Sequence, residues 1–285
     1  MNHAVDRPWV LITGCSTGIG RALVESCRAG GWGVAASARS LAALDGLAPG
    51  PDLRCLELDV TRPDSIAAAA QACAGLRLTA LVNNAGYGQM GPLEYLEPEE
   101  LRAQLETNVV GLHAVTRAFL PLIRRSAAPG EGRIVQVASV LGRMSLPMAG
   151  AYCASKHAVV ALAEVLRLEA GPGIRVILVE PGAIRSAFRS NLGKVLGDLP
   201  ERIRGTRFEP VLTRYLARHR STEEGHGLTA QACARIIAAA MARRRPPRRV
   251  VIGADARWAN VAKAVLPEAL WDWVLSRGFG LGKRE

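Results

Sequence analysis

The chain has 285 residues, of which 49% are hydrophobic and 21% charged, with a formal net charge of +11. A chain of this length buries enough surface to fold without stabilising disulfide bonds or metal ions. Its composition excludes the disordered, collagen-like and coiled-coil classes of protein. The charge surplus lies in residues 201–285, where 17 Lys and Arg face 8 Asp and Glu. Such a surplus fits a solvated Arg-rich surface, nucleic acid, an anionic membrane or an acidic ligand.

Short aliphatic runs alternate with longer amphipathic stretches along most of the chain. The predicted strands are residues 10–12, 34–38, 53–58, 78–82, 133–137, 174–179 and 250–252. The predicted helices are residues 21–29, 63–74, 98–125, 151–170 and 229–242. Because the strands are continuously apolar and separated by helices, they predict a parallel sheet covered on both faces. The expected fold is a doubly wound, Rossmann-like α/β fold of about seven strands.

The domain organisation follows from where this alternation breaks. No linker divides the first part of the chain, so residues 1–285 are predicted to form a single Rossmann-type domain. Residues 183–228 form a long, Arg-rich connection after a strand end, which is typical of a substrate lid, with a surface insertion as the alternative. Residues 254–285 hold three tryptophans in a helical pattern and predict a C-terminal helical extension, packed on the lid, a partner subunit or a membrane surface.

The cysteines and the N-terminus bear on the cellular setting. The six cysteines are scattered, with no Cys-x-x-Cys pair, so neither a disulfide framework nor a metal site is expected. The apolar runs are too short for a transmembrane helix, so no stable membrane insertion is expected. Residues 1–10 lack the apolar stretch of a secretory signal. These features together predict a cytoplasmic protein.

A glycine-rich turn separates the first predicted strand from the first predicted helix. It reads Thr13-Gly14-Cys15-Ser16-Thr17-Gly18-Ile19-Gly20. Glycines let the backbone approach a pyrophosphate closely, and the amides and dipole of a helix N-terminus stabilise its charge. The strand–turn–helix context therefore predicts dinucleotide binding. The alternative is a tight turn that only allows the helix to pack on the strand.

The end of the second predicted strand indicates which dinucleotide is used. An acidic residue there would bind the adenosine ribose of NAD and repel a 2′-phosphate. No Asp or Glu lies between Glu25 and Asp45, and Arg39 and Ser40 stand at the strand end instead. A guanidinium fork and a hydroxyl suit a 2′-phosphate, which favours NADP over NAD. The alternative is that Arg39 is one more surface arginine.

Four residues form a candidate catalytic set. Tyr152 and Lys156 are four apart in a predicted helix and share one face. An ammonium beside a phenol, like a positively charged nicotinamide, would lower the phenol pKa and suit general acid/base catalysis. Ser139 ends the fifth predicted strand and Asn108 lies within the preceding long helix. Each residue alone also fits a structural role, as a strand cap, a tertiary contact or a solvated charge.

Together these motifs resemble the short-chain dehydrogenase/reductase family. The matching residues occur in the family's order over roughly residues 8–190: Thr13, Gly18, Ile19, Gly20, Asp59, Val60, Asn83, Asn84, Ala85, Gly86, Asn108, Ser139, Tyr152, Lys156, Pro181 and Gly182. The resemblance implies an NAD(P)-dependent oxidoreductase of the NADP-preferring type. It would move a hydride between the nicotinamide and a carbonyl or alcohol carbon of a small-molecule substrate. It also implies a homodimer or homotetramer.

The resemblance implies a role for each site residue. Tyr152 exchanges a proton with the substrate oxygen, and Ser139 hydrogen-bonds that oxygen. Lys156 holds the nicotinamide ribose and lowers the Tyr152 pKa, while Asn108 holds a water in a proton relay. The implied cofactor contacts are Gly14, Ser16, Thr17, Gly18, Ile19, Gly20, Arg39, Ser40, Asp59, Val60, Asn84, Ala85, Gly86, Tyr152, Lys156, Pro181, Gly182, Ile184 and Ser186. Thr17 departs from NADP-using members that carry a basic residue there, and Ser186 replaces a frequent Thr.

The segments expected to face the substrate indicate its chemical class, and two other functions remain as alternatives. Residues 87–92, residues 141–150 and the lid are rich in Met, Leu and aromatic side chains, which favour a medium-sized hydrophobic alcohol or ketone. Arg143, Arg185 and Arg189 would instead favour an acidic substrate. The alternatives are a catalytically silent dinucleotide-binding sensor, or a nucleic-acid or membrane binder that uses the basic loop 243–249. A solvated loop is the expectation there, so no nucleic acid is expected.

Overall fold

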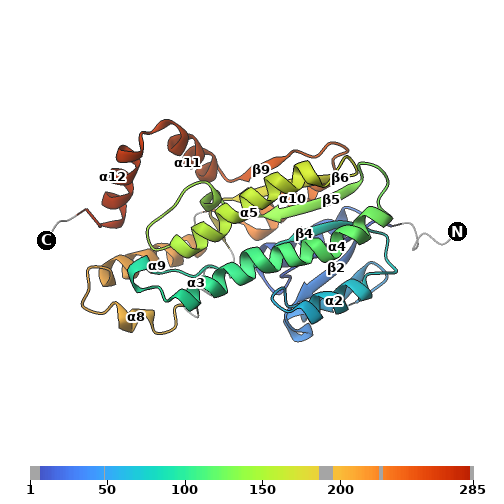
Figure 1. Ribbon diagram of the computed structural model, residues 1–285, viewed down its shortest axis with the longest axis horizontal. Coiled ribbons are helices and arrows are strands. Elements are labelled where there is room, and N and C mark those ends of the chain that lie inside the picture. The colour runs from blue at the N-terminus through green and yellow to red at the C-terminus, as the bar shows by residue number, and fades with distance from the viewer. Residues whose placement is uncertain (1–6, 48, 186–194, 225–226, 283–285) are drawn as a thin grey trace.

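The computed structural model describes residues 7–47, 49–185, 195–224 and 227–282. Its strands form a seven-stranded parallel sheet in the order β3-β2-β1-β4-β5-β6-β9, with helices on both faces (Figure 1). The strands are β1 Trp9–Ile12, β2 Gly33–Ala38, β3 Leu53–Glu57, β4 Leu78–Asn83, β5 Gly132–Val137, β6 Ile174–Pro181 and β9 Arg249–Ile252. All seven predicted strands are present, and the doubly wound α/β fold is confirmed.

The helices bury the two faces of the sheet in separate apolar cores. They are α1 Gly18–Ala29, α2 Pro63–Ala72, α3 Pro98–Leu105, α4 Leu112–Ser126, α5 Gly150–Glu169 and α10 Ala230–Ala242. Side chains of α1 and α10 pack together against one face. Side chains of α2, α4 and α5 pack against the other, with Phe119 and Ile123 fully buried. The strand order changes direction between β1 and β4, which is where open α/β sheets bind ligands.

The stretch predicted as one helix over residues 98–125 is interrupted. Between α3 and α4 lies a π-helical turn, Glu106–Gly111, which contains Asn108. Such turns accommodate an extra residue and frequently occur at functional sites. The turn places the Asn108 side chain inside the protein, where it is 1% exposed. Periodicity could not predict the interruption, because the tertiary contacts of a single side chain maintain it.

The sequence predicts an irregular connection over residues 183–228. Its described part instead contains helices and strands. It holds β7 Ile184–Arg185, α8 Leu199–Arg202, α9 Glu209–Glu224 and β8 Leu228–Thr229. Strand β7 pairs in parallel with β8, so the segment leaves and rejoins the body at one place. The buried side chains of α9, Val211, Leu212 and Tyr215, form only a short apolar stripe. Because arginines surround this stripe in the sequence, the hydrophobic pattern did not predict a helix there.

Two helices follow the last strand, α11 Ala254–Val265 and α12 Glu268–Phe279. They extend from the sheet toward the end of the molecule that carries α8 and α9 (Figure 1). Trp258 and Trp273 are exposed on them, whereas Trp271 is buried. At the end of α12 the ring of Phe279 stacks on Tyr215 of α9, with ring centroids 6.2 Å apart. Within the described part of the chain, no helix has the length and apolarity needed to cross a bilayer.

Candidate active site

The glycine-rich turn is bound to the turn that follows β4. The Thr13 hydroxyl accepts hydrogen bonds from the backbone amides of Asn84 and Ala85, at 3.0 and 2.9 Å. The Asn84 side-chain amide donates to the carbonyls of Thr13 and Gly14, at 2.9 and 3.1 Å. Gly14 adopts a positive φ of 72°, and a Cβ there would lie 2.9 Å from the Ala85 Cα. These contacts hold both turns in one rigid unit at the carboxyl edge of the sheet.

The N-terminus of α1 faces this edge and is equipped for an anion. The preceding residues Ser16 and Thr17 are exposed, and the Thr17 side chain makes no capping hydrogen bond. No acidic residue lies in the first turn of the helix. Free amides and the positive end of the helix dipole favour a phosphate at such a position. Gly14 and Gly18 therefore lie where a pyrophosphate could approach the backbone, whereas Gly20 is buried and a Cβ there would lie 2.2 Å from the Gly14 carbonyl oxygen.

Ser139, Tyr152 and Lys156 are brought together by β5 and the first turns of α5. Ser139 lies just after β5, and its hydroxyl forms a hydrogen bond with the Tyr152 side chain. The Lys156 Nζ lies 5.6 Å from the centroid of the Tyr152 ring and donates to the Val137 carbonyl at 2.9 Å. All three side chains are at most 8% exposed. The structure thus brings both Ser139 and Lys156 close to the Tyr152 side chain.

Burial determines the acidity of this cluster in the free protein. It raises the pKa of Tyr152 to about 12, and the hydrogen bond with Ser139 opposes that rise. Burial also lowers the pKa of Lys156 to about 8. In the protein without cofactor, burial therefore outweighs the hydrogen bond with Ser139 at Tyr152. That Lys156 and a bound nicotinamide lower the Tyr152 pKa stays a prediction.

The lowered Lys156 pKa makes a testable contribution to stability. Below pH 8 the folded protein holds a buried ammonium, which costs stability relative to the unfolded chain. As the pH rises from about 8 to 10.5, the folded protein has already lost this proton, so its relative stability increases. We expect Lys156→Met to be stabilised relative to wild type near neutral pH by up to about 3 kcal/mol. Urea unfolding of both proteins across this range should show the difference shrinking as pH rises; a constant difference would contradict it.

Asn108 makes contacts that the sequence reading did not anticipate. Its Oδ1 accepts from the Tyr87 amide at 3.1 Å, and its Nδ2 donates to the Tyr87 carbonyl at 2.9 Å and to Ser155 Oγ at 3.1 Å. Both amide hydrogens are thus used, and among its side-chain atoms only Oδ1 could accept a further bond. Ser155 in turn donates to the Tyr152 carbonyl at 2.7 Å. Asn108 therefore supports the Tyr152 turn of α5 through Ser155.

Ser155 was missed by the sequence reading. It is fully buried in the interior of α5, where serine is a poor helix former. A small polar residue directly before Lys156, in the helical stretch Ala151-Tyr152-Cys153-Ala154-Ser155, was the available signal. Its link between the π-helical turn and the Tyr152 backbone became visible only in three dimensions.

The predicted adenosine contacts lie at the ends of β2 and β3. Arg39 and Ser40 are exposed, and within the described residues the Arg39 side chain has no hydrogen bond or ion pair. The Asp59 carboxylate accepts from the amide and hydroxyl of Thr61, at 2.9 and 2.7 Å, and shapes the turn after β3. Val60 is buried, so it offers mainly its backbone. The Arg39 guanidinium is thus available to an anion.

The predicted nicotinamide contacts lie around the end of β6. Pro181 is the last residue of β6, the Gly182 amide donates to the Ile252 carbonyl at 2.8 Å, and Ile184 begins β7. Ser186 lies outside the described residues. Gly86, on the turn after β4, is exposed, and a Cβ there would lie 3.0 Å from Asn108 Oδ1. These residues border the same edge of the sheet as Ser139.

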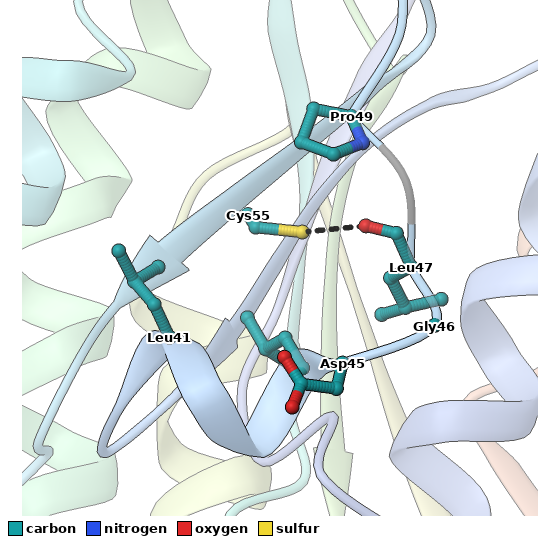
Figure 2. Close-up of a pocket in the computed structure, with 7 residues that line it drawn as sticks. Leu41, Asp45, Gly46, Leu47, Pro49 and Cys55 are labelled. Atoms are coloured by element: carbon teal, nitrogen blue, oxygen red, sulfur yellow. Dashed lines mark hydrogen bonds between the residues drawn. The ribbon is translucent and has the colours of Figure 1, made fainter.

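A separate hollow of about 450 Å³ lies beside the edge strand β3. Figure 2 shows the side chains around it and the contact of the Cys55 Sγ with the Leu47 carbonyl, at 3.4 Å. Its lining residues are Leu41, Leu44, Asp45, Gly46, Leu47, Pro49 and Cys55. None of the Ser139, Tyr152 and Lys156 side chains reaches it. Elsewhere among the described residues, no group of three or more His, Cys, Asp and Glu could hold a metal ion.

Comparison with known proteins agrees with this arrangement. The family model described as short chain dehydrogenase matches residues 8–196. The uncharacterized oxidoreductase YbbO of Escherichia coli is 37% identical over 67% of this chain and 71% of its own length. Human 17-beta-hydroxysteroid dehydrogenase type 1 is 39% identical over 69% of this chain and 62% of its own length. Human retinol dehydrogenase 16 is 37% identical over 67% of this chain and 61% of its own length.

Solved structures extend the similarity to nearly the whole chain. A short chain dehydrogenase from Burkholderia cenocepacia in complex with NADP has a TM-score of 0.75 and 27% identity, over 95% of this chain and 98% of that one. A short chain dehydrogenase/reductase from Burkholderia phymatum in complex with NAD has a TM-score of 0.74 and 26% identity, over 95% and 96%. With its matching fold and family model, the protein belongs to the short-chain dehydrogenase/reductase family and is an oxidoreductase of that family.

Proposed function

We propose that the protein is an NADP(H)-dependent oxidoreductase that interconverts an apolar alcohol and the corresponding ketone or aldehyde, with Tyr152 as the general acid/base. The observation that carries this proposal is the contact of Ser139, Tyr152 and Lys156 at the sheet edge that also bears the glycine-rich turn. Residues 1–285 are proposed to act as one domain, in a homodimer or homotetramer.

The residues at the sheet edge fit a nicotinamide dinucleotide. The uncapped N-terminus of α1 and the close approach at Gly14 suit its pyrophosphate. The free Arg39 side chain and Ser40 suit a 2′-phosphate. Bound there, the nicotinamide would give or accept the hydride at the substrate carbon. The NADP-bound and NAD-bound neighbours are both compatible with this site, so the preference for NADP rests on Arg39 and Ser40.

The protein's own residues supply the proton chemistry. Ser139 orients the substrate oxygen toward Tyr152, whose hydroxyl donates a proton in reduction and accepts one in oxidation. Lys156 lies close enough to stabilise the phenolate as it forms, and its bond to Val137 fixes its position. Asn108 and Ser155 hold the backbone of Tyr152 in place. Burial excludes water from the site. Fixed hydrogen-bond donors of the protein, rather than mobile water, would therefore stabilise the charge that develops on the substrate oxygen.

An apolar cluster on the other side of Tyr152 supports an uncharged substrate. It contains Met90, Met148, Ala149, Tyr152, Cys153, Leu196, Leu199, Ile203, Phe208, Val211, Leu212 and Tyr215. The members from α8 and α9 make residues 183–228 the proposed lid. Arg143, considered for an acidic substrate, is instead paired with the fully buried Glu180 at 3.0 Å. Arg189 lies outside the described residues. Relatives named for hydroxysteroids and retinol agree with an apolar substrate.

The alternative function, a nucleic-acid or membrane binder that uses the basic loop 243–249, has less support. Arg249, the last residue of the basic run, begins β9 and forms ion pairs with Glu164, at 2.6 Å, and with Glu180. Arg243, Arg244 and Arg245 remain exposed in the loop before it. That loop carries no aromatic side chains for stacking on bases. We therefore retain the solvated-loop interpretation for residues 243–249.

Met148 offers a test of the substrate assignment. It has a φ of 69°, which a non-glycine residue adopts at a cost, and its side chain is buried in the apolar cluster with Tyr152. We expect Met148→Gly and Met148→Ala to lower kcat/KM for a bulky neutral ketone about tenfold, with much less effect on a small one. The glycine variant should be the more stable of the two by about 1 kcal/mol, because it removes the backbone strain.

Two outcomes of steady-state kinetics would count against this assignment, while urea unfolding measures the stability of the two variants. Equal losses for bulky and small ketones would mean that the Met148 side chain does not contact the substrate. Faster turnover of a ketone bearing a carboxylate than of its neutral analogue would show that the site selects charge rather than apolar surface.

A further inference from the structure

The turn between β6 and β7 is held by a side chain from the C-terminal extension. Asp255 lies in the first turn of α11, and its Oδ2 accepts a hydrogen bond from the Ala183 amide at 2.7 Å. The two residues are 72 positions apart in the chain. A hydrogen bond from a backbone amide to a carboxylate is among the stronger hydrogen bonds in proteins. The contact ties the extension directly to the turn that follows Pro181.

Two glycines shape the backbone around this carboxylate. A Cβ on Gly182 would lie 2.5 Å from Asp255 Oδ2 and 2.6 Å from Oδ1. Gly253 adopts a φ of 107°, and a Cβ there would collide with Oδ1 of the same side chain. Glycine is needed at both positions because the carboxylate occupies the space that a side chain would take. The Asp255 carboxylate therefore lies against the backbone of two segments, while the residue as a whole remains exposed.

The same turn is fixed from its other sides. The Gly182 amide donates to the Ile252 carbonyl at 2.8 Å, and the Leu228 amide donates to the Ala183 carbonyl at 3.1 Å. Directly after the turn, β7 pairs with β8 where the lid leaves and rejoins the body. Both polar backbone groups of Ala183 are thus bonded, one to the extension and one to the end of the lid. A shift of Asp255 would be passed on to this turn.

We propose that Asp255 is a positioning residue for the nicotinamide half of the cofactor. This inference rests on the proposed function. The Asp255 carboxylate fixes the backbone from Gly182 to Ile184, which would contact the nicotinamide and align the cofactor with Tyr152. The C-terminal extension then forms part of the cofactor site. The adenosine half would be held by residues at the end of β2 and in the glycine-rich turn, which are not among the hydrogen-bond partners of Asp255 in the described residues, so we expect Asp255 to leave that half unaffected.

Binding and kinetics with split ligands test this proposal. NADPH carries both halves, whereas adenosine 2′,5′-bisphosphate carries only the adenosine half. We expect Asp255→Ala to raise the Kd and KM for NADPH about tenfold and to lower kcat, with the Kd for the bisphosphate unchanged. Asp255→Asn should recover most of the loss, because its amide oxygen can accept from Ala183. Asp255→Glu should behave like Asp255→Ala, because the additional methylene moves the carboxylate away from the Ala183 amide that Asp255 reaches at 2.7 Å.

The matched control is Asp272→Ala, which removes an exposed acid from α12 that has no ion pair among the described residues. It should retain wild-type binding and kinetics. Unchanged NADPH affinity and kcat in both Asp255→Ala and Asp255→Glu would overturn the proposal, as would equal weakening of NADPH and the bisphosphate in all three Asp255 variants. Should Asp255→Ala fail to fold, Asp255→Asn against Asp255→Glu makes the same comparison. Failure of the proposed function would appear already in wild type, as absent NADPH binding or turnover.

Discussion

Replacing Tyr152 by Phe is expected to lower kcat by a factor of about 10² to 10⁴ while leaving the affinity for NADPH close to that of wild type. The substitution removes one hydroxyl from a side chain that is 8% exposed and retains the ring that packs in the apolar cluster. The fold and the dinucleotide contacts should therefore persist. Stopped-flow measurement of nicotinamide absorbance gives kcat, and quenching of protein fluorescence gives the Kd for NADPH.

Tyr95→Phe is the matched control for this variant. Tyr95 also packs beside the apolar cluster, against the ring of Phe208 at 5.8 Å, but it lies apart from Ser139 and Lys156. Its loss of a hydroxyl should leave kcat within about twofold of wild type. A Tyr152→Phe enzyme that kept wild-type turnover would remove the basis for the proton-transfer assignment. Equal losses in the two variants would indicate a packing effect instead.

Reversing the charge at Arg39 should have the second largest effect. Arg39→Asp removes a guanidinium that could form two charge-assisted hydrogen bonds with a 2′-phosphate and puts a repelling carboxylate in its place. We expect the KM for NADPH to rise about 100-fold, while the KM for NADH stays unchanged or falls. Because Arg39 is exposed and has no partner among the described residues, stability should change little.

Arg235→Asp controls for the change in net charge. Arg235 is exposed on α10, away from the carboxyl edge of the sheet, and should leave both KM values within about twofold. Raising the salt concentration should weaken the binding of NADPH to wild type more than to Arg39→Asp. An Arg39→Asp enzyme with the wild-type ratio of NADPH to NADH efficiency would contradict NADP preference and leave Arg39 as a surface residue.

The sheet and its helices were predictable because their signals are local. Most strands are short, mainly apolar runs, and the glycine-rich turn and the turn at Pro181 follow their strands directly in the sequence. The same holds for Tyr152 and Lys156, whose spacing in one helix fixes their common face. The order of the motifs then allowed Ser139 and Asn108 to be named without a structure.

The features that could not be predicted depend on contacts between distant segments. The π-helical turn at Asn108 is maintained by bonds to Tyr87 and Ser155, the latter 47 residues away. Helices α8 and α9 contribute Leu199, Val211 and Tyr215 to an apolar cluster whose other members come from distant segments, such as Met90 and Tyr152. Asp255 has no sequence signal at all, because its partners Gly182 and Ala183 lie on another strand end.

The acidity of Tyr152 illustrates why residue identity alone is insufficient. The sequence predicts that Lys156 lies close to Tyr152, and its Nζ lies 5.6 Å from the centroid of the Tyr152 ring. It does not predict how deeply both groups are buried, and burial raises the Tyr152 pKa and lowers the Lys156 pKa.

The most direct test is a turnover screen of the wild-type protein with NADPH and with NADH. Neutral apolar ketones, aldehydes and alcohols of graded size would be assayed by nicotinamide absorbance, alongside calorimetric titration of each dinucleotide. We expect NADPH binding and NADPH-dependent reduction of at least one bulky apolar carbonyl compound, with slower reaction from NADH. Tight NADPH binding without turnover of any compound, or no binding of either dinucleotide, would contradict it.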